Sequence, residues 1–176
     1  PTTEVAVISL AGIVFSRSVK VGGNHMDEAI LQHVKKKFNL LIGDQTAELV
    51  KTTIGNAFAN NKVEHMDIKG RDLVLGVPKI IGLSSDEVRE AISDQLQTII
   101  ETVQIALEQT PPELAGDVVE EGIMLSGGGA LLKNLDKLLH EETRLPITIA
   151  EDPLSNAVTG SGKALDSLDT LRELMV

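Results

Sequence analysis

The chain has 176 residues, which is enough for one domain or slightly more. It carries 26 acidic and 16 basic side chains, and its net charge of −10 argues against binding nucleic acid through a basic surface. Without cysteine it forms no disulfide, thiolate metal site or cysteine nucleophile. Its three aromatic residues are all Phe, so the core must be aliphatic.

The start of the sequence predicts a β-hairpin followed by helices. Two runs rich in β-branched residues, 5–8 and 13–19, flank a short turn that contains Gly12. Next, apolar residues recur every four positions and predict a helix over residues 24–38 with Asn24 as its cap. A second helix is expected from a cap at Asp44 to about residue 54.

Between residues 63 and 83, glycines and a proline separate short apolar runs. We read these runs as three small strands, at residues 63–68, 73–77 and 79–83. Ser84 and Glu87 then have the spacing of a capping box. Apolar residues behind them repeat at helical spacing and predict one long helix, which Pro111 and Pro112 end.

The last third alternates between strands and helices. Strands are expected at residues 123–125 and 146–150, with helices at residues 131–139 and from residue 154 onward. This alternation indicates α/β architecture with parallel strand pairing. Two lobes are expected, with an insertion at about residues 24–83 that splits one α/β layer.

A glycine-rich loop follows the strand at residues 123–125. In the run Ser126-Gly127-Gly128-Gly129-Ala130, the glycines would let a ligand approach the backbone closely. A plain turn between a strand and a helix is the alternative. We favour a ligand because three consecutive glycines carry an entropic cost on folding.

Other motifs give weaker signals. The run Gly160-Ser161-Gly162-Lys163 does not match a P-loop, because Ala157 and Ala164 stand where that motif needs Gly and Ser or Thr. Glu48 and Lys51 share a helix face, an arrangement that is usually a solvated ion pair. The four histidines have no metal-ligand spacing, and no Gly-x-Ser-x-Gly motif supports a hydrolase. We therefore expect no metal site in this chain.

Taken together, several long motifs resemble the MreB family of bacterial actin-like proteins. They cover nearly all of the chain: Thr2-Thr3-Glu4-Val5-Ala6-Val7-Ile8-Ser9-Leu10, Gly12-Ile13-Val14, Val21-Gly22-Gly23, Met26-Asp27-Glu28-Ala29-Ile30, Asn39-Leu40-Leu41-Ile42-Gly43, Thr46-Ala47-Glu48, Ala106-Leu107-Glu108-Gln109, Pro111-Pro112-Glu113-Leu114-Ala115, Leu125-Ser126-Gly127-Gly128-Gly129-Ala130-Leu131-Leu132 and Glu151-Asp152-Pro153-Leu154.

The resemblance implies an actin-like (ribonuclease-H-like) ATPase fold, of which this chain would be the C-terminal lobe. Its base subdomain would be residues 1–22 and 84–176, and residues 23–83 would form a smaller inserted α+β subdomain. The family's ATP lies between two lobes, and its first phosphate loop belongs to the other lobe. Of its second phosphate loop this chain has only Thr2, Thr3 and Glu4, with Pro1 in place of the last glycine.

The resemblance also assigns site residues. Thr2 would lie near the attacking water, and the cofactor of the intact protein would be ATP with Mg. Contacts to the nucleotide would come from Glu48, Leu49, Val50, Lys51, Gly127, Gly128, Gly129 and Ala130.

The implied partners are other copies of the protein, assembled in filaments that set rod cell shape, and the membrane adaptor RodZ. The longest uncharged stretch, residues 5–16, is too short to span a bilayer. We therefore expect a cytoplasmic protein that reaches the membrane through partners or the other lobe, and a segment with no ATPase activity by itself. The alternatives are a protein-interaction module only, or a lobe of a sugar-kinase-type or chaperone-type nucleotide enzyme.

Overall fold

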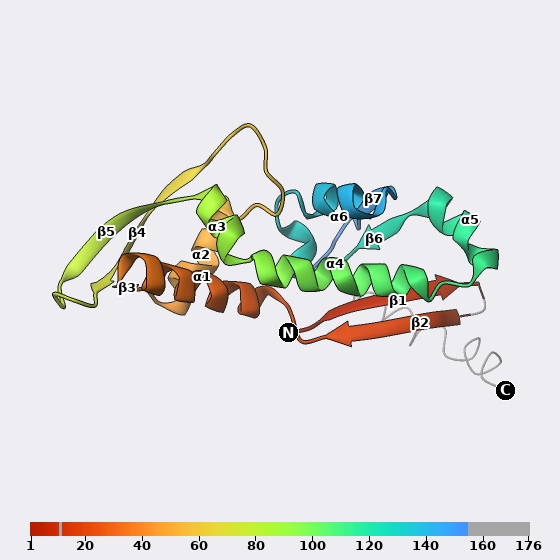
Figure 1. Cartoon of the computed structure of the whole chain (residues 1–176), viewed down its shortest axis with the longest axis horizontal. Helices are drawn as coiled ribbons and strands as arrows, with labels where there is room; N and C mark the ends of the chain where they lie inside the picture. The colour runs from red at the N-terminus through yellow and green to blue at the C-terminus, as the bar shows by residue number, and fades with distance from the viewer. Residues whose placement is uncertain (11, 155–176) are drawn as a thin grey trace.

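The computed structural model of the chain describes residues 1–10 and 12–154. These residues form an elongated α/β structure (Figure 1). Its elements in chain order are β1 (Thr3–Ser9), β2 (Gly12–Val19), α1 (Gly23–Phe38), β3 (Leu40–Leu41), α2 (Asp44–Ile54), β4 (His65–Asp72), β5 (Pro78–Ser84), α3 (Ser85–Ala91), α4 (Ser93–Glu108), α5 (Pro112–Glu121), β6 (Ile123–Leu125), the 3-10 helix η1 (Gly128–Leu131), α6 (Leu135–Thr143) and β7 (Ile147–Ile149).

The strands form three small sheets. β1 and β2 pair antiparallel, as the sequence predicted. β3, β4 and β5 form an antiparallel sheet at the other end of the molecule, and β6 and β7 pair in parallel (Figure 1). The parallel pairing expected for the last third is therefore confirmed for these two strands.

The β4–β5 region corrects one predicted strand. Residues 73–77 form the turn between β4 and β5 instead of a strand. The side chain of Asp72 accepts hydrogen bonds from the backbone N–H groups of Val74 and Leu75, at 2.8 and 2.9 Å, which fixes a tight turn in an apolar sequence. Gly76 completes this turn with a φ of +73°. β3, which the sequence did not predict, pairs with β4 at Leu40 and Leu41.

Helix boundaries also differ from the predictions. α1 and α2 begin after Gly22 and Gly43 without a side-chain cap, so Asn24 and Asp44 lie within the first turns instead of capping them. The predicted long helix is two helices, α3 and α4. They meet at Ile92, whose backbone leaves the helical region while its side chain is fully buried in the core.

Helix α5, which follows Pro111, was not predicted from the sequence. Pro112 occupies the first turn of α5, where backbone N–H groups make no hydrogen bond within the helix. Proline lacks this N–H group and is therefore tolerated there, so the two prolines also start a helix. The predicted helix at residues 131–139 is replaced by η1 and α6, because Asn134 takes a left-handed conformation between them. The helix predicted from residue 154 and the run of residues 160–163 lie outside the described residues.

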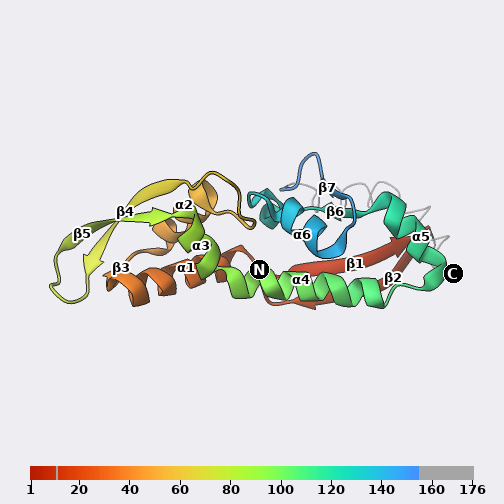
Figure 2. The ribbon, with the colours of Figure 1, turned by 45° about the horizontal axis from the view of Figure 1, so that its top comes forward.

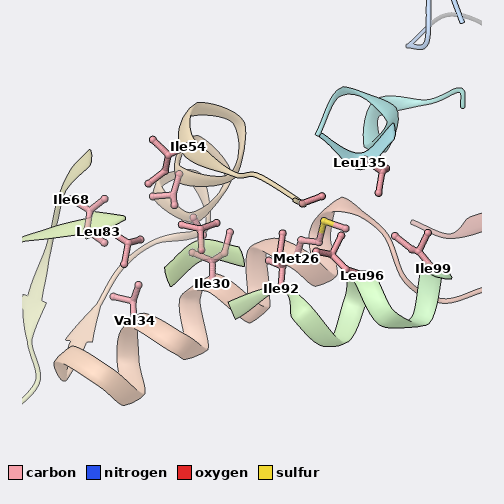
Figure 3. Packing of buried hydrophobic residues seen from close by; sticks show 14 of the residues in the cluster. Met26, Ile30, Val34, Ile54, Ile68, Leu83, Ile92, Leu96, Ile99 and Leu135 are labelled. Atoms are coloured by element: carbon pink, nitrogen blue, oxygen red, sulfur yellow. The ribbon is translucent and has the colours of Figure 1, made fainter. Parts of the chain in front are cut away.

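A single aliphatic core runs along the molecule. Met26, Ile30 and Val34 of α1 form one buried stripe, as their spacing predicted. Figure 3 shows this stripe between Ile68 and Leu83 of the β4–β5 hairpin on one side and Leu96 and Ile99 of α4 on the other. Figure 2 shows α4 lying along β1 and β2. Among the described residues, no helix is long and apolar enough to cross a membrane.

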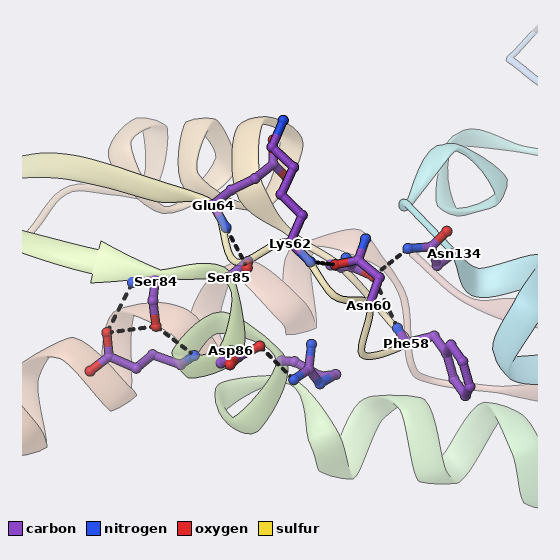
Figure 4. A network of polar contacts seen from close by, with 11 residues as sticks. Phe58, Asn60, Lys62, Glu64, Ser84, Ser85, Asp86 and Asn134 are labelled. Carbon is purple, nitrogen blue, oxygen red and sulfur yellow. Dashed lines mark hydrogen bonds and ion pairs between the residues drawn. The ribbon is translucent and has the colours of Figure 1, made fainter.

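The start of α3 is held by the predicted capping box. The Ser84 hydroxyl accepts from the N–H group of Glu87, and the Glu87 carboxylate accepts from the N–H group of Ser84 (Figure 4). The same carboxylate pairs with Lys37 of α1 at 2.6 Å. Burial raises the pKa of Glu87, but Lys37 and the two Ser84 donors outweigh it, and the pKa lies below its ordinary value.

The lowered pKa of Glu87 predicts a pH effect. A carboxyl whose pKa is lower in the folded state stabilises that state at neutral pH, and this contribution is lost as pH falls below about 4.5. In Glu87→Gln, the free energy of unfolding should therefore be lower at pH 7 and should fall less than that of the original chain on acidification. Urea unfolding at several pH values measures this. Glu142→Gln on exposed α6 is the control, and an identical pH profile for Glu87→Gln would contradict the assignment.

Candidate functional site

The glycine-rich loop leaves β6 and enters η1. Gly127 has a φ of +85°, a conformation that favours glycine, and its N–H group donates to the carbonyl of Pro153 at 2.6 Å. A Cβ atom added at Gly127 or Gly129 would meet no protein atom within 4 Å, whereas one at Gly128 would touch Leu154. The described residues therefore do not fill the space over Gly127 and Gly129, and a ligand can approach the backbone there.

α2 supplies the two charged residues of the site, and they are not paired with each other. The Lys51 ammonium contacts Asp27 of α1 at 2.8 Å and donates to the carbonyl of Gly23 at 3.1 Å. Both side chains of this ion pair are mostly buried. Glu48 is exposed, and within the described part of the chain its carboxylate has no ion pair or hydrogen bond. The solvated Glu48–Lys51 pair considered from the sequence is therefore not formed.

The N-terminus of the chain lies against the start of α1. A Cβ atom added at Gly22 would lie 3.0 Å from the side chain of Pro1, so a larger residue would require Pro1 to shift by a few tenths of an ångström. The Thr3 hydroxyl donates to the carbonyl of Val21 at 2.6 Å and is thus occupied. Thr2 is exposed next to it, at the N-terminal end of α1.

A polar tie joins α2 to the glycine-rich loop. The Asn134 amide donates to Oδ1 of buried Asn56 at 2.9 Å, and the carbonyl of Lys133 accepts from the N–H group of Ala57 at 2.8 Å. The Lys133 ammonium reaches back to the carbonyl of Thr53 and to the Glu64 carboxylate. Figure 4 shows Asn134 beside the segment that follows α2. The tie brings together two parts of the chain that the sequence separates by 78 residues.

These elements border one cleft with a volume of about 1740 Å³. Of the residues predicted from the sequence, those lining it are Thr2, Glu48, Lys51, Gly127, Gly128, Gly129 and Ala130. Leu49 and Val50 do not line it: Leu49 faces solvent on another side of α2, and Val50 is fully buried in the core. Val50 therefore has no surface that could contact a ligand.

The chemistry of this cleft suits a ligand that carries hydroxyl groups and approaches the glycine backbone closely. An unpaired carboxylate at Glu48 can accept hydrogen bonds from hydroxyls, and the open glycine backbone can lie against the ligand. The described residues contain no group of three or more His, Cys, Asp and Glu side chains that could hold a metal ion.

Several residues of the site were not identified from the sequence as parts of it. Asp27 and Gly23 fix Lys51, and Asn56, Lys133 and Asn134 form the tie. Their contacts are long-range, so spacing along the chain could not reveal them. The one local signal is Asn134, since asparagine is enriched at left-handed positions.

Comparison with known proteins identifies the sequence family. The family model described as MreB/Mbl protein matches residues 1–173. The cell shape-determining protein MreB of Escherichia coli (strain K12) is 51% identical over 168 residues, which are 96% of this chain and 48% of that protein. The cell shape-determining protein Mbl of Bacillus subtilis (strain 168) is 42% identical over 170 residues, 97% of this chain and 51% of that protein. The chain thus spans about half the length of these relatives.

Solved structures give the same result for the fold. MreB5 of Spiroplasma citri, crystallised with AMPPNP, superposes with a TM-score of 0.91 at 40% identity and covers 99% of this chain and 53% of that chain. The MamK double helical filament matches with a TM-score of 0.72 at 21% identity, which supports the fold alone. The actin-like α/β fold expected from the sequence is confirmed.

The Asp27–Lys51 ion pair allows a test of the site's geometry. Asp27→Asn leaves a mostly buried ammonium without its counter-charge, so the free energy of unfolding should fall by roughly 2 kcal/mol. The double variant Asp27→Asn/Lys51→Met removes that ammonium and should lose less stability than Asp27→Asn alone. Urea unfolding of Asp27→Asn, Lys51→Met and the double variant completes the cycle, and strictly additive effects would contradict a direct contact.

Proposed function

Because this chain belongs to the MreB/Mbl family, we propose that it is one lobe of an actin-like cytoskeletal ATPase that assembles into filaments and directs rod cell shape. The single observation that carries the proposal is the cleft. In it, the fold brings together an open glycine loop, the unpaired Glu48 carboxylate and the Lys51 side chain, which an ion pair with Asp27 holds in place. Its relative MreB5 was crystallised with AMPPNP and with ADP, which supports an adenine nucleotide as the ligand.

In this proposal the chain supplies the adenosine side of the nucleotide site. Gly127, Gly128, Gly129 and Ala130 place their backbone against the base, and the Glu48 carboxylate accepts hydrogen bonds from the ribose hydroxyls. The Lys51 side chain lines the pocket in a fixed position. It does not act as a counter-ion for phosphate, because Asp27 already balances its charge. Leu49 and Val50, which the resemblance assigned to the same site, do not line the cleft.

Hydrolysis needs groups that these residues do not supply. Transfer of a phosphoryl group requires a metal ion and positioned donors around the phosphate chain. When bound, Mg²⁺ would neutralise charge on the phosphates. Thr2 lines the cleft, and in the complete protein its hydroxyl would orient an attacking water. We expect the 176-residue chain alone to release no phosphate from ATP at a rate comparable with intact relatives.

The proposal includes the subdomains and the partners. Residues 23–83 would be the inserted subdomain, since β3, β4 and β5 pair only with one another and lie beside α1 and α2. Residues 1–22 and 84–176 would be the base, which would receive the membrane adaptor RodZ. Filament protomers would be the second partner, consistent with the filament formed by the structural neighbour MamK. The protein would then be cytoplasmic and reach the membrane through these partners.

Nucleotide binding tests the central part of the proposal. In isothermal titration with ATP, Gly129→Val should weaken binding about tenfold, because its side chain would enter the open space over the glycine loop where the base would lie. Glu48→Ala should also weaken binding about tenfold, through loss of hydrogen bonds to a charged acceptor. Leu49→Ala is the matched control, since this exposed neighbour on α2 does not line the cleft. Unchanged affinity in both site variants would show that the ligand binds elsewhere.

A further inference from the structure

A second, smaller cavity borders α6 outside the proposed nucleotide cleft. Its volume is about 300 Å³. We call it the α6 pocket, and it is lined by Phe58, Asp136, Lys137, His140, Glu141 and Ile147. None of these six residues lines the nucleotide cleft. The α6 pocket is therefore a separate site, to which the proposed function assigns no role.

Helix α6 forms the wall between the two cavities. Leu135 and Leu139 are buried on the face of α6 that borders the nucleotide cleft. Asp136 and His140 are also four residues apart and share a different face, which borders the α6 pocket. A ligand in the α6 pocket would therefore contact side chains that a nucleotide does not reach.

The apolar part of the pocket is preformed. The N–H group of Phe58 donates at 3.1 Å to Oδ1 of Asn56, the same oxygen that accepts from Asn134 directly before α6 (Figure 4). This contact holds Phe58 next to α6. Ile147 of β7, which packs against α6, adds a second apolar side chain. A ligand would meet these surfaces already in place and would lose little free energy in ordering them.

The polar part of the pocket contains an unpaired carboxylate. Asp136 is half-buried, and within the described residues its carboxylate makes no ion pair or hydrogen bond. Its position in the first turn of α6 also favours a negative charge through the helix dipole. Glu141 adds a second carboxylate, whose contact with Arg144 is long, at 3.5 Å. A cation in the pocket would therefore gain charge-assisted hydrogen bonds.

His140 supplies a further hydrogen-bond acceptor. Its Nδ1 atom lies 2.8 Å from the carbonyl oxygen of buried Leu145. Because a carbonyl only accepts, Nδ1 must carry the proton, and Nε2 of the neutral ring is left as an acceptor. Lys137 is the only ammonium among the described residues that line the pocket, and it is exposed, so its long side chain can extend into solvent.

We propose that the α6 pocket binds a cation on an apolar stem, either a guanidinium or a primary ammonium group. The cation would lie beside the carboxylates of Asp136 and Glu141 and donate to Nε2 of His140. Its stem would lie against Phe58 and Ile147, and the aromatic ring would add a cation–π attraction. Free alkylamines carry such a group, and so do the arginine and lysine side chains of a partner protein.

The lining favours a cation over an anion or a metal ion. An anion would meet two carboxylates and one exposed ammonium, so repulsion would exceed attraction. A metal ion needs several ligands at short range, and no group of His, Cys, Asp and Glu within the described part of the chain is arranged to hold one. The net charge of −10 also raises the concentration of cations near the protein.

Two probes with the same stem test the proposal on the isotope-labelled 176-residue chain. Butylguanidine carries the charge, and butylurea has nearly the same shape without it. In amide NMR titrations, butylguanidine should shift Phe58, His140 and Ile147 with one saturation curve and leave Gly127 and Gly129 in place. Its affinity should exceed that of butylurea at least about tenfold, because only the guanidinium forms charge-assisted hydrogen bonds.

Variants of α6 test the sign of the charge that the pocket prefers. Asp136→Asn should weaken butylguanidine binding about tenfold, and Lys137→Gln should strengthen it, because a like charge is removed. Glu142→Gln is the matched control, since this exposed carboxylate lies next to Glu141 but outside the pocket.

A further variant addresses the second role of Asp136 at the start of α6. Phe58→Leu keeps an apolar side chain and all charges but removes the ring, and should weaken binding about threefold. Circular dichroism should be unchanged in this variant.

A third probe distinguishes the two sources of the cation. In acetyl-Gly-Arg-Gly-amide the same guanidinium is attached to a peptide. Tighter binding of this peptide than of butylguanidine would identify the ligand as a partner's side chain, since the neighbouring backbone then adds contacts. Equal or weaker binding of the peptide would identify it as a free alkylamine.

Several results would overturn the inference. Equal affinity for butylguanidine and butylurea would show that the pocket is merely apolar. Stronger binding to Asp136→Asn together with weaker binding to Lys137→Gln would show that it does not select a cation. Shifts of Gly127 and Gly129 in place of Phe58 would locate the cation in the nucleotide cleft, and shifts that do not saturate would show that no site exists.

Discussion

The polar tie between Asn56, Lys133 and Asn134 determines whether this chain forms the candidate nucleotide cleft. It fixes the end of α2, which carries Glu48 and Lys51, against the loop that carries Gly127, Gly128 and Gly129. Asn56 is 2% exposed, and its side-chain oxygen also accepts from the N–H group of Phe58. Each such hydrogen bond contributes about 0.5–1.5 kcal/mol, so the tie as a whole favours one arrangement of the two segments. The cleft is therefore a consequence of long-range hydrogen bonding more than of either motif alone.

Local periodicity predicted much of the fold because the physics of those elements is local. The apolar stripe of α1, the β1–β2 hairpin and the capping box at Ser84 each depend on residues a few positions apart. Predictions were wrong where a distant or unusual contact decides the conformation. The hydrogen bonds of Asp72 fold an apolar run into a turn. The predicted long helix is interrupted at Ile92, whose side chain is buried in the core.

The residues of the candidate site also fall into those that local sequence could identify and those that only long-range contacts bring together. The glycine loop could be identified from the sequence because consecutive glycines are costly unless the backbone needs them. The partner of Lys51 could not, since Asp27 comes from another helix. Assigning every residue between Glu48 and Lys51 to a ligand ignores the geometry of a helix, in which adjacent residues face different directions. Val50 consequently lies in the core, and Leu49 faces away from the cleft.

Charge is distributed less evenly than the composition implies. Acidic residues dominate the whole sequence, yet exposed lysines and an arginine collect around the β4–β5 turn, and acidic residues cover α5. Net charge alone describes solubility and argues against a nucleic-acid surface, but it does not describe an end-to-end difference of this kind. The aliphatic core along α1 and α4 connects the two ends in one body, so their separation is fixed by the fold.

The most direct measurement of the central claim is amide NMR of the isotope-labelled chain titrated with ATP. Glycine amides serve as reporters because they are spread over the whole structure. The claim predicts that Gly127, Gly128, Gly129 and Gly23 shift together with one saturation curve, while Gly43, Gly76 and Gly116, which do not line the cleft, remain in place. Shifts confined to residues outside the cleft, or a glycine loop that does not respond at saturation, would contradict the assignment of this cleft as the adenine-nucleotide site.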